Sequence, residues 1–253
     1  MRSKTYGDVQ GTGKRRKIKK NRTNKNKTTP KFGSCVASVS ASLNHTKSEV
    51  QVSMKMYYFY GVMGSSKTAM ALMKKFSFEE HGKKVLLAKP ATDFRDGEKV
   101  LKSRIGIKSK AVVLEEGETL REKVKNLDLY DVIITDESQF FTENQIEELR
   151  LLADNGYIVM CFGLKTDYMS RLFEGSKRLL EIADCIREVT TSCICGKKAV
   201  LNLKVDGFSV VKEGAQIDLG TEEKYLPMCH KCYAASFLSG HPVNCKNPNF
   251  LVD

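Results

Sequence analysis

The stretch from Met56 to Thr68 constrains the fold more than any other part of this 253-residue chain. An apolar and aromatic run at residues 56–60 leads into a loop with two glycines, and a helix-forming segment follows at once. A buried strand, a glycine loop and a helix in this order are typical of a phosphate-binding loop, in which main-chain N–H groups and the helix N-terminus surround phosphates. The stretch therefore predicts an α/β fold that binds a phosphorylated ligand.

Short apolar runs alternate with longer mixed segments along the next hundred residues. The elements that we expect are four strands and two helices, at residues 56–60, 85–88, 130–135 and 158–162 and at residues 67–80 and 142–155. Thr142 is a candidate N-cap of the second helix and Gly156 its stop. Strands alternating with helices favour a mostly parallel sheet with helices on both faces. We therefore expect a P-loop-type α/β domain over residues 54–189.

The loop departs at one position from the pattern G-x-x-x-x-G-K-[ST], because Ser66 stands where the second glycine is expected. Position 66 should need either an unusual backbone angle or a close approach to phosphate, and a side chain makes both costlier. In this pattern Lys67 neutralises the β- and γ-phosphates and Thr68 holds Mg²⁺. An ordinary Gly/Ser turn before a helix is the alternative. The candidate phosphate-binding residues are Gly61, Met63, Gly64, Ser65, Ser66, Lys67 and Thr68.

Two acids, Asp136 and Glu137, end the apolar run at residues 130–135. Open α/β sheets bind ligands at the carboxyl ends of their strands. Asp136 is therefore placed to organise Mg²⁺ or its water shell, and Glu137 to lie beside an acceptor hydroxyl. A positioned general base contributes about 10²–10⁴ in rate, and phosphoryl transfer depends otherwise on positioning and charge neutralisation. Two solvated acids at a strand end are the alternative.

The net charge of +12 is concentrated at the N-terminus. Residues 1–31 hold 12 Lys and Arg and one acid, while the remainder holds 30 basic and 29 acidic residues. We expect residues 1–53 to be a disordered basic extension, because their composition offers too little apolar surface to offset chain entropy. The basic cluster at residues 14–20 could be a nuclear address, a nucleic-acid-binding arm, part of a targeting peptide or only a solvated tail. The near-neutral composition of the rest of the chain argues against nucleic acid as a partner of any part other than this basic arm.

No apolar run reaches the roughly 18 residues that span a bilayer, and no secretory signal is present. We therefore expect a cytoplasmic protein without a membrane partner. Eight cysteines in such a chain indicate metal binding and buried thiols rather than disulfides.

With these motifs on one chain, residues 56–233 resemble the thymidine kinases of the cellular, bacterial and poxvirus type, and most of all the bacterial members. The matching stretches are residues 58–68, Thr92-Asp93-Phe94-Arg95, Ser103-Arg104-Ile105-Gly106, Asp136-Glu137-Ser138-Gln139-Phe140-Phe141, Gly163-Leu164-Lys165-Thr166-Asp167-Tyr168, Leu172-Phe173-Glu174-Gly175-Ser176 and residues 193–198. The resemblance implies transfer of the γ-phosphate of ATP to the 5′-hydroxyl of thymidine, giving thymidine monophosphate in deoxynucleoside salvage. It further implies Mg²⁺ as cofactor and a homotetramer inhibited by thymidine triphosphate.

The resemblance also implies residue roles. Glu137 becomes the catalytic base, while Asp93 and Arg95 help to hold the Mg²⁺ shell and stabilise the transferring phosphoryl group. Without the resemblance, Asp93 and Arg95 would be interpreted as an exposed ion pair, and most of the nucleoside candidates as core. The residues implied to enclose the nucleoside are Met63, Phe140, Leu164, Tyr168 and Phe173. The residues implied to form a lasso loop over thymine are Gln216, Ile217, Asp218, Leu219, Gly220 and Tyr225.

Four cysteines bracket this lasso and could form a tetrahedral Zn²⁺ site: Cys193, Cys195, Cys229 and Cys232. The second pair is C-x-x-C, but the first is C-x-C, one residue tighter than in most zinc ribbons. Free thiols on a β-hairpin lobe are therefore the alternative, and His230 could substitute as a ligand. We expect a small zinc-ribbon-like lobe over residues 190–238 and a tail over residues 239–253. Cys161 and Cys185 are expected to be buried fillers.

Two other functions stay open. A relative impaired by Ser66 would bind nucleotide and nucleoside without turnover, as a sensor or an inactive subunit. A nucleic-acid-dependent ATPase would account for the basic arm, although the near-neutral body and the lack of a second motor lobe argue against it.

Overall fold

The computed structural model describes residues 55–92, 99–214, 216 and 224–247. The expected disordered extension, residues 1–53, lies outside this part of the chain. Among the described helices, none is both long and apolar enough to cross a membrane.

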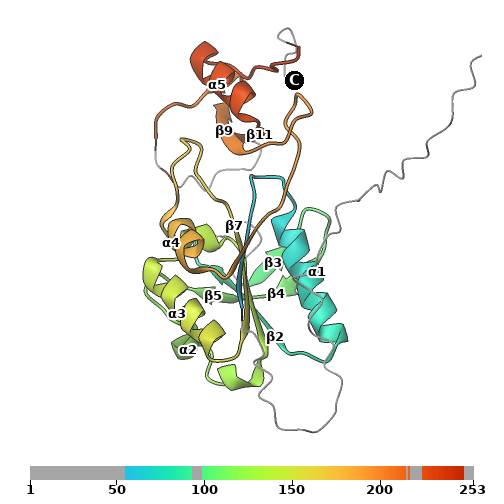
Figure 1. The fold of residues 1–253 in the computed structure, drawn as a ribbon, viewed down its shortest axis with the longest axis vertical. Coiled ribbons are helices and arrows are strands. Elements are labelled where there is room, and N and C mark those ends of the chain that lie inside the picture. Colours follow the sequence, from blue (N-terminus) through green and yellow to red (C-terminus); the bar gives the residue numbers. More distant parts are fainter. Residues whose placement is uncertain (1–54, 93–98, 215, 217–223, 248–253) are drawn as a thin grey trace, which may run out of the picture. The chain divides into compact units, whose positions relative to one another are not determined.

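A six-stranded parallel sheet in the order β5-β2-β6-β7-β1-β8 lies at the centre of the fold (Figure 1). Its strands are β1 (Met56–Tyr60), β2 (Val85–Pro90), β5 (Val112–Leu114), β6 (Val132–Thr135), β7 (Ile158–Gly163) and β8 (Cys185–Glu188). The predicted parallel sheet is thus confirmed. The third predicted strand begins two residues late, because the N–H of Tyr130 bonds to the carbonyl of Leu127 and closes the turn η1 (Leu127–Leu129).

Helices cover both faces of the sheet, α1 (Lys67–Glu80) on one side and α3 (Glu143–Asp154) with α4 (Glu174–Ile182) on the other (Figure 1). Successive side chains of a strand point to opposite faces. Phe59 accordingly packs in one apolar cluster with Leu72 of α1, whereas its neighbour Tyr58 packs in the other with Leu149 of α3. The shorter elements are β3 (Val100–Lys102), β4 (Lys108–Lys110), α2 (Leu120–Lys123) and η2 (Ser138–Phe140).

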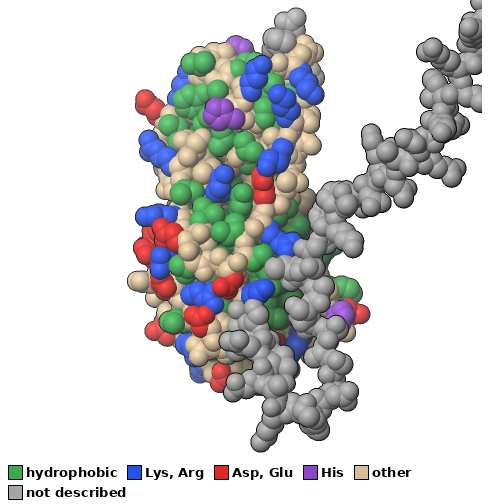
Figure 2. All heavy atoms as spheres, in the orientation of Figure 1, with side chains coloured by type: hydrophobic (Ala, Val, Ile, Leu, Met, Phe, Trp, Pro, Cys, Tyr) green, Lys and Arg blue, Asp and Glu red, His purple; other side chains and the backbone are tan. Residues whose placement is uncertain are grey.

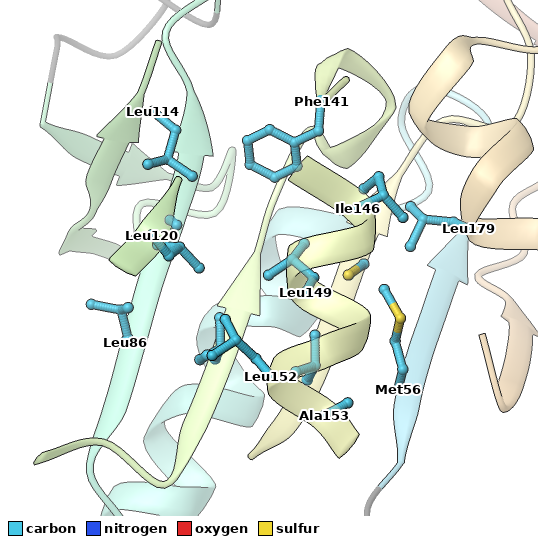
Figure 3. Packing of buried hydrophobic residues seen from close by; sticks show 14 of the residues in the cluster. Met56, Leu86, Leu114, Leu120, Phe141, Ile146, Leu149, Leu152, Ala153 and Leu179 are labelled. Carbon is cyan, nitrogen blue, oxygen red and sulfur yellow. The ribbon is translucent and has the colours of Figure 1, made fainter. Parts of the chain in front are cut away.

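The sequence signals at the ends of α3 are confirmed. The Thr142 hydroxyl accepts a hydrogen bond from the N–H of Gln145 at 3.4 Å, and the Gln145 side chain accepts one from the N–H of Thr142 at 3.1 Å, which together form a capping box. Ile146, Leu149 and Leu152 point from α3 into the cluster beneath it (Figure 3).

Acidic and basic side chains lie next to one another over α3 and α4, on the left in Figure 2. Arg178 of α4, for example, pairs with Glu147 of α3 and with Glu181. This mixture is what the near-neutral composition of the body predicts.

The C-terminal lobe contains a three-stranded antiparallel sheet and one helix. Its elements are β9 (Leu201–Asp206), β10 (Ser209–Val210), β11 (Tyr225–Met228) and α5 (His230–Ser239). The four candidate zinc ligands lie in the small core of this lobe. A mixed α/β architecture with a cysteine-containing lobe therefore agrees with the predicted fold class.

Candidate active site

The phosphate loop joins β1 to α1 and is bent where the sequence predicted strain. Ser66 has φ 64° and ψ 27°, in the left-handed region, and so does Gly64 with φ 74°. A non-glycine residue costs about 1–3 kcal/mol in such a conformation. The expectation that position 66 needs an unusual backbone angle is confirmed.

Three contacts from different parts of the chain fix this loop. The N–H of Gly61 donates to the carbonyl of Gly163 at 3.2 Å, and a Cβ at position 61 would come within 2.4 Å of the carbonyl oxygen of Val189. The N–H of Met63 donates to Oδ1 of Asn202, on β9, at 2.8 Å. The loop is therefore held both by the sheet and by the C-terminal lobe.

Lys67 begins α1 beneath the loop. Its ammonium group donates to the carbonyl of Val62 at 2.9 Å and to the Ser65 hydroxyl at 3.4 Å. The charge of Lys67 also acts on Asp136 across the site, where it offsets part of the rise that burial causes in the pKa of that carboxyl. Lys67 and Asp136 thus share one electrostatic environment.

Asp136 follows β6 and is only 1% exposed. Burial, and next the negative charge of Glu137, raise the pKa of Asp136 to about 7, although Thr68 and Lys67 counter part of the rise. Neither carboxylate oxygen accepts a well-formed hydrogen bond from the described residues, even though the Thr68 side chain is near. Buried carboxylates normally have partners. The Thr68 hydroxyl and the main-chain N–H of Glu137 are the donors nearest to Asp136, and neither makes a well-formed hydrogen bond. An under-satisfied carboxylate beside a hydroxyl fits Mg²⁺, which prefers carboxylate, hydroxyl and water oxygens.

Glu137 comes next in the chain and also has a left-handed backbone, with φ 50° and ψ 35°. Its Oε2 atom accepts a hydrogen bond from Nε2 of Gln139 at 2.5 Å. In the described part of the chain the non-glycine residues with positive φ are Ser66, Glu137 and Ser170, which follow β1, β6 and β7. Backbone strain is thus found at the carboxyl edge of the sheet, where parallel sheets bind ligands.

A cavity of about 410 Å³ lies at this edge. Of the residues predicted from sequence, it brings together Met63, Gly64, Ser66, Lys67, Thr68, Asp136, Glu137 and Leu164. The opposite wall is the β3–β4 hairpin with Leu101, Lys102, Ser103, Arg104 and Ile105. No role was assigned to this hairpin, although Arg104 belongs to a stretch that carried the resemblance. The Nη1 atom of Arg104 lies 4.0 Å from the position that a Cβ on Gly64 would occupy, so the Arg104 guanidinium faces the phosphate loop.

The cavity lining does not include the nucleoside candidates Phe140, Tyr168 and Phe173. The carbonyl of Leu164, which does line it, accepts hydrogen bonds from the Tyr58 hydroxyl at 2.8 Å and the Ser176 hydroxyl at 2.6 Å. The rings of Phe140 and Phe173 meet edge to face, with their centroids 5.6 Å apart. These contacts make an apolar surface with fixed geometry.

Three further nucleoside candidates carry polar groups. Tyr168 is buried, and its hydroxyl has no hydrogen-bond partner among the described residues. At the ends of the predicted lasso, Gln216 donates to the carbonyl of Leu172 at 3.2 Å and Tyr225 is half-buried in β11. The other predicted site residues lie outside the described part: Asp93, Arg95, Ile217, Asp218, Leu219 and Gly220.

The four predicted ligand cysteines converge, and their Sγ atoms all lie within 4.8 Å of one another. The tight C-x-C pair can do this because Gly196, with φ 77°, closes a turn in which its N–H donates to the carbonyl of Cys193. Cys195 Sγ and Cys229 Sγ are 3.7 Å apart. Zn–S bonds of about 2.3 Å in a tetrahedron place neighbouring sulfurs about 3.8 Å apart, so the group could bind zinc.

The four thiols differ in their charge states, because burial raises the pKa of Cys193 and of Cys232 while Cys195 shifts the other way. The main-chain N–H of Lys197 is the largest cause that lowers the pKa of Cys195 to about 6, and thiolates are the form that binds metal. His230 is exposed and lies outside the four-cysteine group.

Two other cysteines differ from expectation. Cys185 is half-buried on the edge strand β8, so its prediction as a buried filler was wrong, whereas Cys161 is buried as predicted. Cys245, to which the sequence assigned no role, packs against the cluster, and its N–H donates to Sγ of Cys232 at 3.2 Å.

Comparison with known proteins gives a consistent result. A family model described as thymidine kinase matches residues 54–233. The thymidine kinase of Streptococcus gordonii is 40% identical over 182 residues, covering 71% of this chain and 95% of that protein. The thymidine kinase of Rhizobium meliloti is 37% identical over 184 residues, covering 70% and 94%. Among solved structures, a Bacteroides Pif1 bound to single-stranded DNA aligns with 54% of this chain and 38% of its own at a TM-score of 0.34 and 18% identity, which is too weak a likeness to support any conclusion.

Proposed function

Because the chain belongs to the thymidine kinase family and is a thymidine kinase, we propose that it transfers the γ-phosphate of ATP to the 5′-hydroxyl of thymidine. The observation that supports this proposal best is that Lys67 of the phosphate loop, Asp136 and Glu137 line the same cavity. A phosphate donor and an acceptor hydroxyl can meet there.

The donor binds through its phosphates. Main-chain N–H groups of residues 61–68 and the N-terminus of α1 attract the anion, and Lys67 neutralises charge on the β- and γ-phosphates. Thr68 and Asp136 would hold Mg²⁺ or its water shell, and the metal when bound draws charge from the phosphate oxygens. By resemblance, Asp93 completes that shell and Arg95 stabilises the transferring group.

The acceptor is activated by Glu137. Its carboxylate takes the proton of the 5′-hydroxyl while that oxygen attacks the γ-phosphorus, and the bond to the bridging oxygen of ADP breaks. The surfaces of Leu164, Phe140 and Phe173 enclose thymidine, and the lasso reads thymine through main-chain groups. The products are thymidine monophosphate and ADP.

The wider setting is part of the proposal. A structural Zn²⁺ held by the four cysteines stabilises the lobe that carries the lasso. The enzyme acts in deoxynucleoside salvage in the cytoplasm, a compartment with which the lack of disulfides among the seven described cysteines agrees. A homotetramer belongs to the proposal by resemblance, and exposed apolar side chains on α1, Met73 at 60% and Phe76 at 63%, offer a surface for contact between copies of the chain.

Release of ADP, measured with and without thymidine, tests the proposal. The Glu137→Gln variant should keep its fold and lose about 10²–10⁴ in kcat, because the proton acceptor is removed. Glu116→Gln, at an exposed acid of the β5–α2 loop, is the matched control and should keep the wild-type rate. Full activity of Glu137→Gln would reject the assigned base.

The strain at Ser66 favours one alternative, a relative that binds nucleotide and thymidine without turnover. The ADP-release assay separates this alternative from the kinase, because the alternative binds both ligands saturably but releases no ADP. A Ser66→Gly variant that gains turnover would support it.

A further inference from the structure

Gln139 is buried in the turn η2 with both ends of its side-chain amide engaged. Its side chain is 2% exposed. Nε2 donates to Oε2 of Glu137 at 2.5 Å, and Oε1 accepts from the main-chain N–H of Leu164 at 2.9 Å. The amide therefore bridges the proposed base to a residue that lines the same cavity.

The surroundings leave this bridge little room to move. A Cβ on Gly163 would lie 2.7 Å from Oε1 of Gln139, and a Cβ on Gly175 would lie 2.5 Å from the carbonyl of Ser138. The end of β7 and the start of α4 thus press directly against η2. At the Leu164 end of the bridge, the hydroxyls of Tyr58 and Ser176 donate hydrogen bonds to the carbonyl of Leu164 and hold it in place.

Glu137 needs such support, because its own backbone does not favour the observed geometry. A left-handed glutamate is strained and is retained only when its surroundings fix it. The hydrogen bond from the Gln139 amide engages Oε2 of the carboxylate directly. Since a neutral amide neither gives up nor takes a proton, Gln139 orients the carboxylate without competing with it.

We propose that Gln139 is a positioning residue that holds the Glu137 carboxylate against the nucleoside-binding wall at Leu164 and so sets kcat. This inference rests on the proposed function, in which Glu137 is the base. Gln139 itself makes no contact that the reaction requires. Its effect should therefore appear in kcat and vanish when the base is absent.

The test is a double-mutant cycle between Gln139→Met and Glu137→Gln, with ADP release as the assay. Gln139→Met alone should lower kcat about 10–100-fold, the scale expected for a misplaced catalytic group. KM for ATP and for thymidine should change less than about twofold. In the Glu137→Gln background the second substitution should lower kcat no further, because the group it orients has already been removed.

Gln145 offers a matched control, since it is also a buried glutamine, and its Nε2 donates to the carbonyls of Glu115 and Glu118 at 2.8 and 2.9 Å. Gln145→Met should lower Tm and leave kcat of the folded enzyme within about twofold. If Gln139→Met does not fold, Gln139→Glu serves instead. It keeps the volume and the acceptor for Leu164 but sets a like charge against Glu137, so it should also lower kcat.

The outcomes separate the two proposals. Wild-type kcat in either Gln139 variant, or an equal loss in both backgrounds, would overturn the positioning role alone. Absence of thymidine-dependent turnover in the wild type, or full activity of Glu137→Gln, would overturn the proposed function and this inference with it.

Discussion

The parallel sheet buries apolar side chains in two clusters, one on each face, whereas the C-terminal lobe has one small core. Four of the ten buried residues in that core are the clustered cysteines. The sheet can be stable through burial of apolar area alone. A small lobe buries too little apolar surface for this, and such modules commonly depend on metal or disulfide cross-links. The two regions should therefore respond to different perturbations.

Removal of zinc should have the largest effect and should be confined to the lobe. Structural Zn²⁺ binding contributes about 10–16 kcal/mol in small zinc modules. A strong chelator should therefore abolish hydrogen-exchange protection in β9 and β11 and expose four thiols to a thiol reagent. Protection of β2, β6 and β7 should persist, and Cys161 should stay unreactive because burial leaves it no exposed surface and raises its pKa to about 12. Loss of protection in both regions at the same chelator concentration would show that the sheet also depends on the metal.

A cavity in the sheet core should have the next largest effect. Leu149 is 2% exposed and points into the cluster beneath α3 (Figure 3). Leu149→Ala should lower the free energy of unfolding by about 2–5 kcal/mol, measured by urea denaturation, while the zinc content stays unchanged. Leu151→Ala, two residues away and 58% exposed, is the control and should cost less than about 0.5 kcal/mol. Equal losses in the two variants would show that α3 does not pack as described.

Relief of the backbone strain at Ser66 should have the smallest effect on stability. Ser66 lies in the phosphate loop, which both the sheet and the C-terminal lobe contact. Ser66→Gly should raise the free energy of unfolding by about 1 kcal/mol, because glycine adopts φ 64° without steric cost. Ser170→Gly relieves the same strain, φ 63°, outside the phosphate loop. Only Ser66→Gly should also change the dissociation constant for ATP, measured by calorimetry. If Ser170→Gly changed the dissociation constant for ATP by the same amount, the effect of Ser66→Gly on ATP binding would be due to global stability and not to the phosphate loop.

The parts that were predictable from sequence were those with local signals. The sequence predicts the helix Lys67–Glu80 with its observed bounds, and it predicts the group of four cysteines that the structure brings together. The strands β5 and β8 were missed, because three or four residues carry no clear periodicity. The bridge made by Gln139 and the contact of Asn202 with the phosphate loop could not be predicted, since each joins segments more than 20 residues apart.

The hydrogen bond from the N–H of Met63 to Asn202 links two binding equilibria. Asn202 belongs to the strand that packs with the cysteine core, and Val62, the neighbour of Met63, is part of that core. If zinc binding changes the affinity for ATP by some factor, thermodynamic reciprocity requires that ATP binding changes the affinity for zinc by the same factor. If zinc raises the affinity for ATP, a chelator must remove less zinc at equilibrium from the nucleotide-loaded enzyme, so the phosphate donor would protect a site that it never contacts.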